Sequence, residues 1–381
     1  MKINNRISEL YEYHFKALET TKVAMINDGV DILDLSIGEP DLEVKQEIKK
    51  ALIESLNYDG FNKYPPYEGI DELKEEVKAY YLRRYNVKLE NNEIIILIGS
   101  KEGLNNLIPA ICNIGDIAIT PSLAYPVYRT SCKIWGVENY PVPLLSSKEY
   151  FPDIYNIPMN IKDKAKLMMI NYPNNPTGAI LSYDFMNECR EFSLSKDIVL
   201  CNDNAYGDII NKGEKPISIL MKGKENMIEF GSFSKTYSMA GFRLGYAVGD
   251  NKVIRALSTI KSNVDSGQFI SIQKAGIEAL KLGDDFIDYV RDIYEKRRQQ
   301  CEELLNYRNF EFFKGKGTFY IWVKTPKGYS SKEFCNYLLK EYGILVTPGQ
   351  VFGYQGYDFF RISLTEKLEK IKKAFLRIKE V

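Results

Sequence analysis

Short apolar runs alternate with longer amphipathic stretches through the first two thirds of the chain. The runs, which predict buried strands, lie at residues 93–98, 117–120, 167–170, 198–201 and 227–230. After the first of them, Leu104, Leu107 and Ile111 recur at helical spacing, and residues 185–195 also have a helical pattern. This alternation predicts an α/β fold in which helices sandwich a mostly parallel sheet.

The N-terminal part of the chain has three further helical patterns. Residues 6–28 predict a helical arm, and residues 41–56 and 70–85 predict amphipathic helices. An apolar run at residues 32–37 ends in Gly38, which permits a tight turn where backbone approaches a ligand. A turn that only the fold requires is an equally good interpretation of this glycine.

The pattern changes in the last third of the chain. Residues 253–310 predict long helices, and the charged stretch at residues 294–303 is typical of a solvated helix face. Strands are then predicted at residues 317–323, 344–346 and 359–364, with helices at residues 332–342 and from Lys367 onward. This order predicts a second, smaller α+β domain with its own antiparallel sheet.

The composition excludes several classes of protein. A chain of 381 residues with 45% hydrophobic content can bury a large core and more than one domain. Lysine plus arginine and aspartate plus glutamate each number 51, so nothing favours nucleic-acid binding. Residues 1–15 lack the apolar segment of a signal peptide, and no apolar run approaches the roughly 18 residues of a membrane span. We therefore expect a cytoplasmic protein with no membrane segment.

The cysteine and histidine content narrows the chemistry further. The six cysteines form no CxxC pair and lie at positions 112, 132, 189, 201, 301 and 335. Such spacing is typical of reduced, mostly buried thiols in a cytosolic protein. Because His14 is the only histidine and no ligand cluster surrounds it, a zinc site and a Ser-His-Asp triad are both disfavoured. We expect no metal.

Polar residues collect where five of the predicted strands end. The clusters lie at residues 99–101, 125, 174–175, 203–206 and 232–235. In open parallel sheets, ligands bind beyond the carboxyl ends of the strands, so we expect these clusters to converge on one crevice. The turn at residues 99–103 leads into a helix, whose first backbone N–H groups can bind an anion. This turn matches neither the Walker A spacing nor the dinucleotide GxGxxG fingerprint, which disfavours a nucleotide-binding dehydrogenase.

The chemistry centres on the segment from Ser232 to Arg243. Lys235 lies between small hydroxyl residues there, and Arg243 follows eight positions later. A lysine amine can form a Schiff base with an aldehyde, while hydroxyls and a guanidinium can bind phosphate oxygens. Pyridoxal phosphate carries both an aldehyde and a phosphate. A polar turn with a solvated lysine is the alternative interpretation of this segment taken alone.

Several motifs together resemble one family of enzymes. They are Asn-Asn-Pro-Thr-Gly at residues 174–178, Asp203 with Tyr206, Ser232-x-Ser-Lys235, Arg243 and the late Arg361. Their order and spacing resemble the fold type I pyridoxal-phosphate aminotransferases of class I and II along nearly the whole chain. The resemblance implies that Lys235 forms the internal aldimine and then acts as general acid and base in a ping-pong transamination. It also implies that Asp203 pairs with the protonated ring nitrogen, which makes the ring an electron sink.

The same resemblance implies the remaining contacts to cofactor and substrate. Asn175 and Tyr206 would hydrogen-bond the phenolic oxygen of the ring, and Tyr125 would stack on the ring. The phosphate contacts would come from Ser232, Ser234, Arg243 and the backbone at Ser100 and Lys101. Arg361 would bind the substrate α-carboxylate bidentately, with the Gly38 N–H opposite.

The resemblance also implies an assembly and a division into domains. The active site of the family lies at a dimer interface, so we expect a homodimer in which Tyr64 reaches the phosphate of the partner subunit from a proline-rich loop. Residues 1–40 would form an N-terminal arm and part of the small domain, residues 41–280 the large cofactor-binding domain, and residues 281–381 the small domain. The other partners expected are small-molecule amino acids and 2-oxo acids.

A closer resemblance is to the bacterial-type LL-diaminopimelate aminotransferases, a subgroup of this family. The segments that carry it lie at residues 98–103, 125–128, 171–178, 234–237, 262–269, 346–349 and 361–365. This likeness implies transfer of an amino group from glutamate to tetrahydrodipicolinate, in the synthesis of lysine and cell-wall precursors. Tyr13, Lys101 and Asn263 would be further ligand contacts.

Two departures from the family pattern lie beside the expected ring site. Leu123 and Ala124 precede Tyr125 where the family has Pro-Gly, and Asn202 and Asn204 flank the acidic residue of the ring site. Other reactions therefore stay open: transamination of alanine, aspartate, aromatic or methionine-type substrates, β-elimination from a cysteine-like substrate, and binding without turnover. Release of pyruvate and ammonia without an oxo-acid acceptor would indicate the elimination.

Overall fold

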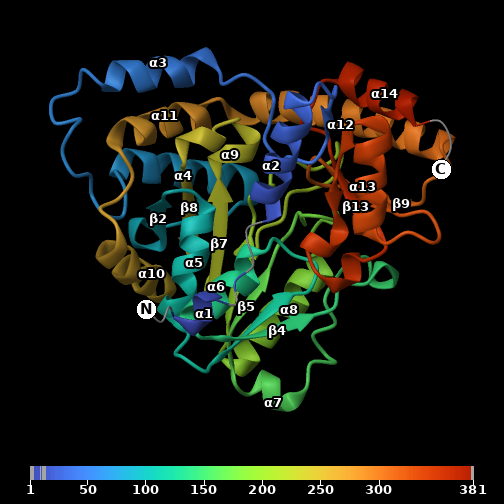
Figure 1. The fold of residues 1–381 in the computed structure, drawn as a ribbon. Helices are drawn as coiled ribbons and strands as arrows, with labels where there is room; N and C mark the ends of the chain where they lie inside the picture. Colours follow the sequence, from blue (N-terminus) through green and yellow to red (C-terminus); the bar gives the residue numbers. More distant parts are fainter. Residues whose placement is uncertain (1–3, 9, 11–13, 379–381) are drawn as a thin grey trace.

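The computed structural model describes residues 4–8, 10 and 14–378, and Figure 1 shows its two main sheets with the helices packed against them. The strands of the larger sheet, in spatial order, are β2 (Ile94–Leu97), β8 (Gly245–Gly249), β7 (Met227–Ser232), β6 (Val199–Asp203), β5 (Ala165–Ile170), β3 (Ile117–Pro121) and β4 (Glu138–Val142). All neighbouring pairs are parallel except those of β8, which runs antiparallel to both β2 and β7. The predicted α/β fold with a mostly parallel sheet is therefore confirmed.

The apolar runs locate the inner strands because both faces of this sheet are buried. Every residue of β2 and of β3 is buried, which is why each reads as a continuous apolar run rather than an alternating one. The sequence pattern does not predict β4, since it lies at the edge of the sheet and only one of its five residues is buried.

Alternate residues along the strands point to opposite faces of the sheet, and each face has its own helices. Ile95 and Leu97 belong to one core, and Ile94 and Ile96 belong to the other. The first core includes residues of α5 (Ser100–Ile111), α6 (Val127–Trp135) and α10 (Asn251–Val264). The second includes residues of α4 (Asp71–Tyr85), α8 (Tyr183–Lys196) and α11 (Ile270–Lys281), and α3 (Gln46–Ser55) packs on α11. Two short helices lie in the connections between strands of this sheet: α7 (Met159–Lys162) precedes β5, and α9 (Phe233–Thr236) follows β7.

The C-terminal part of the chain forms a second, antiparallel sheet, as predicted. Its strands, in spatial order, are β12 (Thr347–Pro348), β13 (Phe359–Ser363), β10 (Tyr320–Lys324) and β9 (Phe312–Phe313). The helices beside it are α12 (Gly283–Tyr307), α13 (Ser331–Tyr342) and α14 (Leu368–Arg377). β1 (Leu33–Asp34) pairs in parallel with β11 (Ile344–Leu345), which ties the N-terminal segment to this part. The domain boundaries at residues 40 and 280 stay a prediction.

Two predicted helices at the N-terminal end have different bounds in the structure. The predicted arm is divided into α1 (Asn5–Ser8) and α2 (His14–Asn27). α3 begins at Gln46 rather than at Asp41. The reason is a long-range ion pair, because Asp41 accepts two hydrogen bonds from Arg297 of α12, at 2.6 and 2.8 Å, and residues 41–45 are not helical.

The predicted solvated face of α12 is wrong for two of its charged residues. Arg297 and Arg298 are only 8% and 3% exposed. Arg298 donates from Nη2 to the carbonyl oxygens of Gly317 and Thr318, at 3.0 and 2.9 Å. The Asp41 carboxylate explains the buried Arg297, and backbone carbonyl oxygens explain the buried Arg298. Helical spacing alone cannot reveal such partners.

Two further observations concern the cysteines and the helices. All six cysteines are buried and free, as predicted. Among the helices that the structure describes, none has both the length and the apolar character that crossing a membrane requires.

Candidate active site

The polar strand ends of the larger sheet meet at a cavity of about 250 Å³. The residues that line it are Ile37, Gly38, Ser100, Lys101, Leu104, Tyr125, Asn171, Asn175, Asp203, Ala205, Tyr206, Ser232, Ser234, Lys235, Ala240, Arg243, Tyr320 and Arg361. Each of the five polar clusters in the sequence contributes at least one of these residues. The cavity lies at the carboxyl edge of the parallel strands, where ligands bind in sheets of this kind.

Lys235 reaches the cavity from α9, directly after β7. Ser232 ends that strand and caps the helix, since its Oγ accepts a hydrogen bond from Ser234 N at 3.2 Å. The Lys235 Nζ donates to the Gly38 carbonyl oxygen at 2.6 Å. Burial is the main cause that lowers the pKa of Lys235 below its ordinary value. A lowered pKa leaves more of the amine unprotonated and able to act as a nucleophile.

Asp203 is the acidic residue of the cavity, at the end of β6. Its Oδ2 accepts a hydrogen bond from the Tyr128 hydroxyl at 2.7 Å. Among the residues that the structure describes, none gives its buried Oδ1 a hydrogen bond. Burial raises the pKa of Asp203 to about 6, against the opposing effect of the Tyr128 hydrogen bond. A buried carboxylate oxygen without a donor suits a cationic N–H group of a ligand.

The loop at residues 171–178 is tied to this acid. Asn171 donates from Nδ2 to the Asp203 carbonyl oxygen at 2.7 Å, and its Oδ1 accepts from Asn175 N at 2.9 Å. Within the loop, Asn174 Oδ1 accepts from the Thr177 hydroxyl at 2.7 Å and from its backbone N–H at 3.1 Å. The Asn-Asn-Pro-Thr-Gly motif therefore fixes the position of Asn175 relative to Asp203.

Arg361 enters the cavity from the second sheet and is only 2% exposed. Its Nη1 donates to Asn175 Oδ1 at 2.8 Å, and its Nη2 donates to the Ser36 carbonyl oxygen at 2.6 Å. The guanidinium carbon lies 3.9 Å from the ring centroid of Tyr320. A guanidinium held in one plane in this way can bind a carboxylate through two parallel hydrogen bonds.

A separate wall of the cavity suits an anion. α5 begins at Ser100, so its first backbone N–H groups lie at this wall. Gly99 has φ +77°, a backbone conformation that favours glycine, and it lies beside the Arg243 guanidinium, since a Cβ atom there would lie 2.7 Å from Nη2. Burial and the nearby Arg243 lower the pKa of Lys101, whose Nζ lies 5.8 Å from the Tyr125 ring centroid.

Two predicted site residues do not line the cavity, and a third lies outside the described residues. Tyr64 is 86% exposed on the loop between α3 and α4. Asn263 is exposed on α10, where its Nδ2 donates to the Thr259 carbonyl oxygen at 2.8 Å. Tyr13 lies outside the described residues. The other predicted site residues are all brought together.

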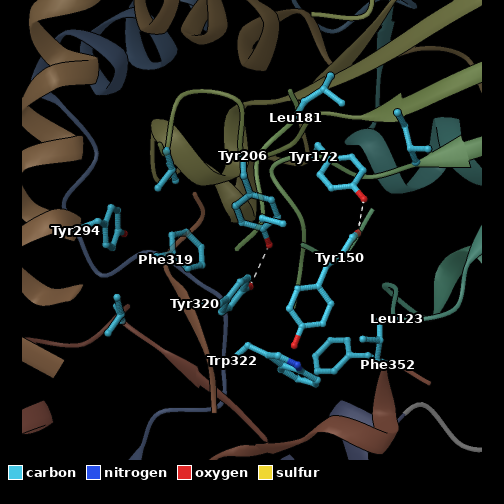
Figure 2. Close-up of a cluster of buried hydrophobic side chains, with 14 of the residues drawn as sticks. Leu123, Tyr150, Tyr172, Leu181, Tyr206, Tyr294, Phe319, Tyr320, Trp322 and Phe352 are labelled. Carbon is cyan, nitrogen blue, oxygen red and sulfur yellow. Dashed lines mark hydrogen bonds between the residues drawn. The ribbon is translucent and has the colours of Figure 1, made fainter. Parts of the chain in front are cut away.

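Two residues of the site were not singled out by the sequence. Tyr128 reaches Asp203 from α6. It follows Tyr125, an expected ring contact, by three positions, and this helical spacing is the one sequence signal that points to it. Tyr320 lies in an apolar strand pattern that indicates only a core position. Figure 2 shows its hydroxyl pointing at the hydroxyl of Tyr206, at 3.0 Å.

These groups fit pyridoxal phosphate. Its ring nitrogen would supply the donor that Asp203 Oδ1 lacks, and its phosphate would meet the hydroxyls and N–H groups of the anion wall, while Lys235 lies within the same cavity. A mostly parallel sheet with this donor set at its carboxyl edge defines the class of fold type I pyridoxal-phosphate enzymes.

Comparison with known proteins gives the family within this class. The chain belongs to the aminotransferase class I and II family, whose model matches residues 30–378. It is therefore a pyridoxal-phosphate-dependent transaminase that acts on amino acids and 2-oxo acids. The predicted family, cofactor and enzyme class are confirmed.

The similarity extends over the whole chain. The LL-diaminopimelate aminotransferase of Aquifex aeolicus is 41% identical, with 100% of this chain and 99% of that protein covered. The enzyme of the same name from Syntrophobacter fumaroxidans is 38% identical, with 99% and 98% covered. Among solved structures, substrate-bound BacF from Bacillus subtilis has a TM-score of 0.95 at 34% identity, with 99% of this chain and 97% of that chain covered. The Thermus thermophilus aspartate aminotransferase with maleate has a TM-score of 0.93 at 27% identity, with 99% of each chain covered.

Proposed function

We propose that this enzyme transfers an amino group between glutamate and tetrahydrodipicolinate and so forms LL-diaminopimelate, a precursor of lysine and cell-wall peptides. The observation that carries the proposal is the full-length similarity to several relatives named LL-diaminopimelate aminotransferase, at 37–41% identity. The cavity supports it, since Arg361 and Lys101 both line it and offer cations to a substrate with more than one carboxylate.

Four residues make the polar contacts to the ring of the cofactor and its aldehyde. Bound pyridoxal phosphate supplies an aldehyde that condenses with amines and a protonated ring that withdraws electrons. Lys235 holds the cofactor and later carries the proton that leaves the α-carbon of the substrate, as its lowered pKa permits. Asp203 keeps the ring nitrogen protonated through Oδ1, while Tyr206 donates a hydrogen bond to the phenolic oxygen together with the Asn175 amide.

The remaining cofactor contacts orient the ring and neutralise the phosphate. Tyr125, which lines the cavity, would stack on the ring. The phosphate is held by Ser100, Ser232, Ser234, Arg243 and the backbone at Lys101. The N-terminal N–H groups of α5 and the Arg243 guanidinium supply positive charge at one end of the cavity, which leaves the opposite end for the substrate.

The substrate end of the cavity is built around Arg361. Its guanidinium binds the α-carboxylate, and the N–H of Gly38 donates to the same group from the opposite loop. Lys101 interacts with a polar group farther along the substrate.

The enzyme acts as a homodimer with shared active sites. Four aromatic or apolar side chains near Tyr64 and Asn263 are strongly exposed, namely Tyr64 at 86%, Tyr67 at 50%, Val264 at 61% and Phe269 at 39%. The two segments that carry them touch, because a Cβ atom at Gly267 would lie 3.0 Å from the Pro66 carbonyl oxygen. An exposed apolar patch of this kind supports burial against a second copy. In that dimer Tyr64 reaches the phosphate of the partner subunit, and Asn263 and Tyr13 would be further ligand contacts.

The enzyme works in the cytoplasm. The six buried, free cysteines support this location, because such thiols stay reduced there.

A coupled assay tests the proposed substrate. Purified enzyme loaded with pyridoxal phosphate is given 2-oxoglutarate and LL-diaminopimelate, and glutamate formation is measured. Alanine, aspartate, phenylalanine and methionine are compared at equal concentration. The proposal predicts that kcat/KM for LL-diaminopimelate exceeds the others by roughly tenfold or more. Equal or higher values for another amino acid would contradict the substrate while leaving the transaminase intact, and Lys235→Ala is the inactive control.

A further inference from the structure

Tyr320 touches two sides of the active-site cavity, and none of the roles above uses it. It is the first residue of β10 and is only 2% exposed. Its hydroxyl lies 3.0 Å from the Tyr206 hydroxyl (Figure 2), and its ring centroid lies 3.9 Å from the guanidinium carbon of Arg361. One side chain therefore contacts a residue assigned to the cofactor and a residue assigned to the substrate.

The backbone around Tyr320 is held from several directions. Arg298 donates to the carbonyl oxygens of Gly317 and Thr318, at 3.0 and 2.9 Å. Thr318 N donates to the Ile209 carbonyl oxygen at 2.7 Å, and Tyr320 N donates to Thr318 Oγ1 at 3.1 Å. The position of the Tyr320 ring is therefore set by the fold before any ligand binds.

The loop that carries Gly38 is shaped around the same hydroxyl. A Cβ atom at Gly38 would come within 1.7 Å of Tyr320 Oη, so only glycine fits there. The Gly38 carbonyl oxygen accepts the hydrogen bond from Lys235 Nζ, at 2.6 Å. Tyr320 thus lies beside the loop that holds the reactive amine as well.

We infer that Tyr320 is a shared positioning residue, whose hydroxyl directs the Tyr206 hydroxyl toward the cofactor and whose ring fixes the plane of the Arg361 guanidinium for the substrate. The inference rests on the proposed roles of Tyr206 and Arg361, but it does not depend on which amino acid is the substrate. The two contacts use different parts of the side chain, so each effect can be removed separately.

The hydroxyl effect has a definite direction. When Tyr206 donates its proton to the phenolic oxygen of the cofactor, its own oxygen accepts from Tyr320. A hydrogen bond received in this way strengthens the one that is donated. Removal of the Tyr320 hydroxyl weakens the stabilisation of negative charge on the phenolic oxygen. The pH at which the bound cofactor loses its yellow colour therefore rises.

The variant Tyr320→Phe tests the hydroxyl, with visible absorbance of the loaded enzyme followed against pH. We expect the midpoint of the colour change to rise by roughly 0.2–0.7 pH unit. KM for the amino acid that the wild-type enzyme uses fastest should change less than about twofold, because the ring under Arg361 stays. In a Tyr206→Phe background the same substitution should give no further shift, since the residue that transmits the effect is absent.

The variant Tyr320→Leu tests the ring. Loss of the aromatic face under Arg361 should raise KM for that amino acid by about three- to thirtyfold, beyond any change that Tyr320→Phe causes. Circular dichroism and thermal unfolding of each variant report whether the fold persists. If Tyr320→Leu does not fold, the Tyr320→Phe titration still tests the hydroxyl. The role of the ring is then tested by comparing Tyr320→Trp, which keeps an aromatic face, with Tyr320→Met, which does not.

The matched control is Tyr294→Phe. Tyr294 belongs to the same buried cluster (Figure 2), and its hydroxyl has no hydrogen-bond partner among the described residues. This variant should leave the colour midpoint unchanged. The inference is overturned if Tyr320→Phe titrates like the wild type, or if its full shift persists in the Tyr206→Phe background. An unchanged KM in a folded Tyr320→Leu variant would overturn the ring role. A different preferred substrate would affect only the proposed function.

Discussion

Asp203 shows how a single residue prepares the site for a cation. Burial raises the pKa of its carboxyl group from 3.8 to about 6, although the Tyr128 hydroxyl at 2.7 Å acts in the opposite direction. The folded state therefore holds a proton on this group more tightly than the unfolded chain does. As pH rises through the window between about 4 and 6, the free energy of unfolding falls, because the ionised form is the one that burial penalises. A bound cation that pairs with Oδ1 removes this penalty.

The variant Asp203→Asn separates stability from activity. Without cofactor, the stability of this variant relative to the wild type should rise between pH 4 and pH 6, because the amide is never ionised. We expect the difference in the free energy of unfolding to be larger above pH 6 than below pH 4 by on the order of 2–3 kcal/mol. With cofactor, kcat/KM should fall by roughly 100- to 1000-fold. Chemical denaturation of both cofactor-free proteins at several pH values measures the first effect. A stability difference that does not depend on pH would contradict the raised pKa.

At the scale of elements, the sequence predicts strand ends well and long-range polar partners poorly. The inner strands β6 and β7 are mainly apolar, and Asp203 and Lys235 lie within a few residues of the ends of these apolar runs, so their places at the sheet edge are readable from the pattern. Glu229 lies inside β7 and is fully buried, yet local pattern gives no reason for a carboxylate there. Its partners are the Tyr81 hydroxyl and the Asn202 amide, each at 3.0 Å, from elements far apart in the chain. Sequence periodicity contains no information about such pairings.

Arg298 of α12 gives a test at this scale. Arg298→Ala leaves the carbonyl oxygens of Gly317 and Thr318 without their buried donor, at the start of β10. We expect the free energy of unfolding to fall by about 2–4 kcal/mol. Lys296 is exposed on the same helix, so Lys296→Ala should change stability by less than about 0.5 kcal/mol. Urea denaturation of both variants measures these changes. Equal midpoints would show that the buried Arg298 does not stabilise the fold.

At the scale of the whole molecule, the site needs both sheets. The larger sheet contributes Lys235 and Asp203, and the antiparallel sheet contributes Tyr320 and Arg361. The family resemblance, rather than periodicity, predicts this combination, because the late arginine is more than 100 residues beyond the lysine. Tyr64 lies outside the cavity of its own chain, as expected if it acts in a partner subunit.

Subunit complementation tests the shared site. Lys235→Ala and Tyr64→Ala subunits are each expected to form dimers with little or no activity. In a mixed dimer, the Lys235 of one chain meets the Tyr64 of the other, so one intact site forms. Re-assortment of equal amounts should restore about a quarter of wild-type activity. A mixture that has only the sum of the two parent activities, although exchange is shown by mass spectrometry, would contradict a role for Tyr64 in the partner site.

A half-reaction without an acceptor tests whether the enzyme transaminates LL-diaminopimelate. Wild-type enzyme loaded with pyridoxal phosphate is mixed with LL-diaminopimelate alone, and its visible absorbance and products are followed. We expect loss of the yellow colour with release of a single equivalent of oxo-acid product per Lys235, and recovery of the colour when 2-oxoglutarate is added. Continuous release of ammonia, or no colour change with LL-diaminopimelate while the enzyme is fully loaded, would contradict this expectation.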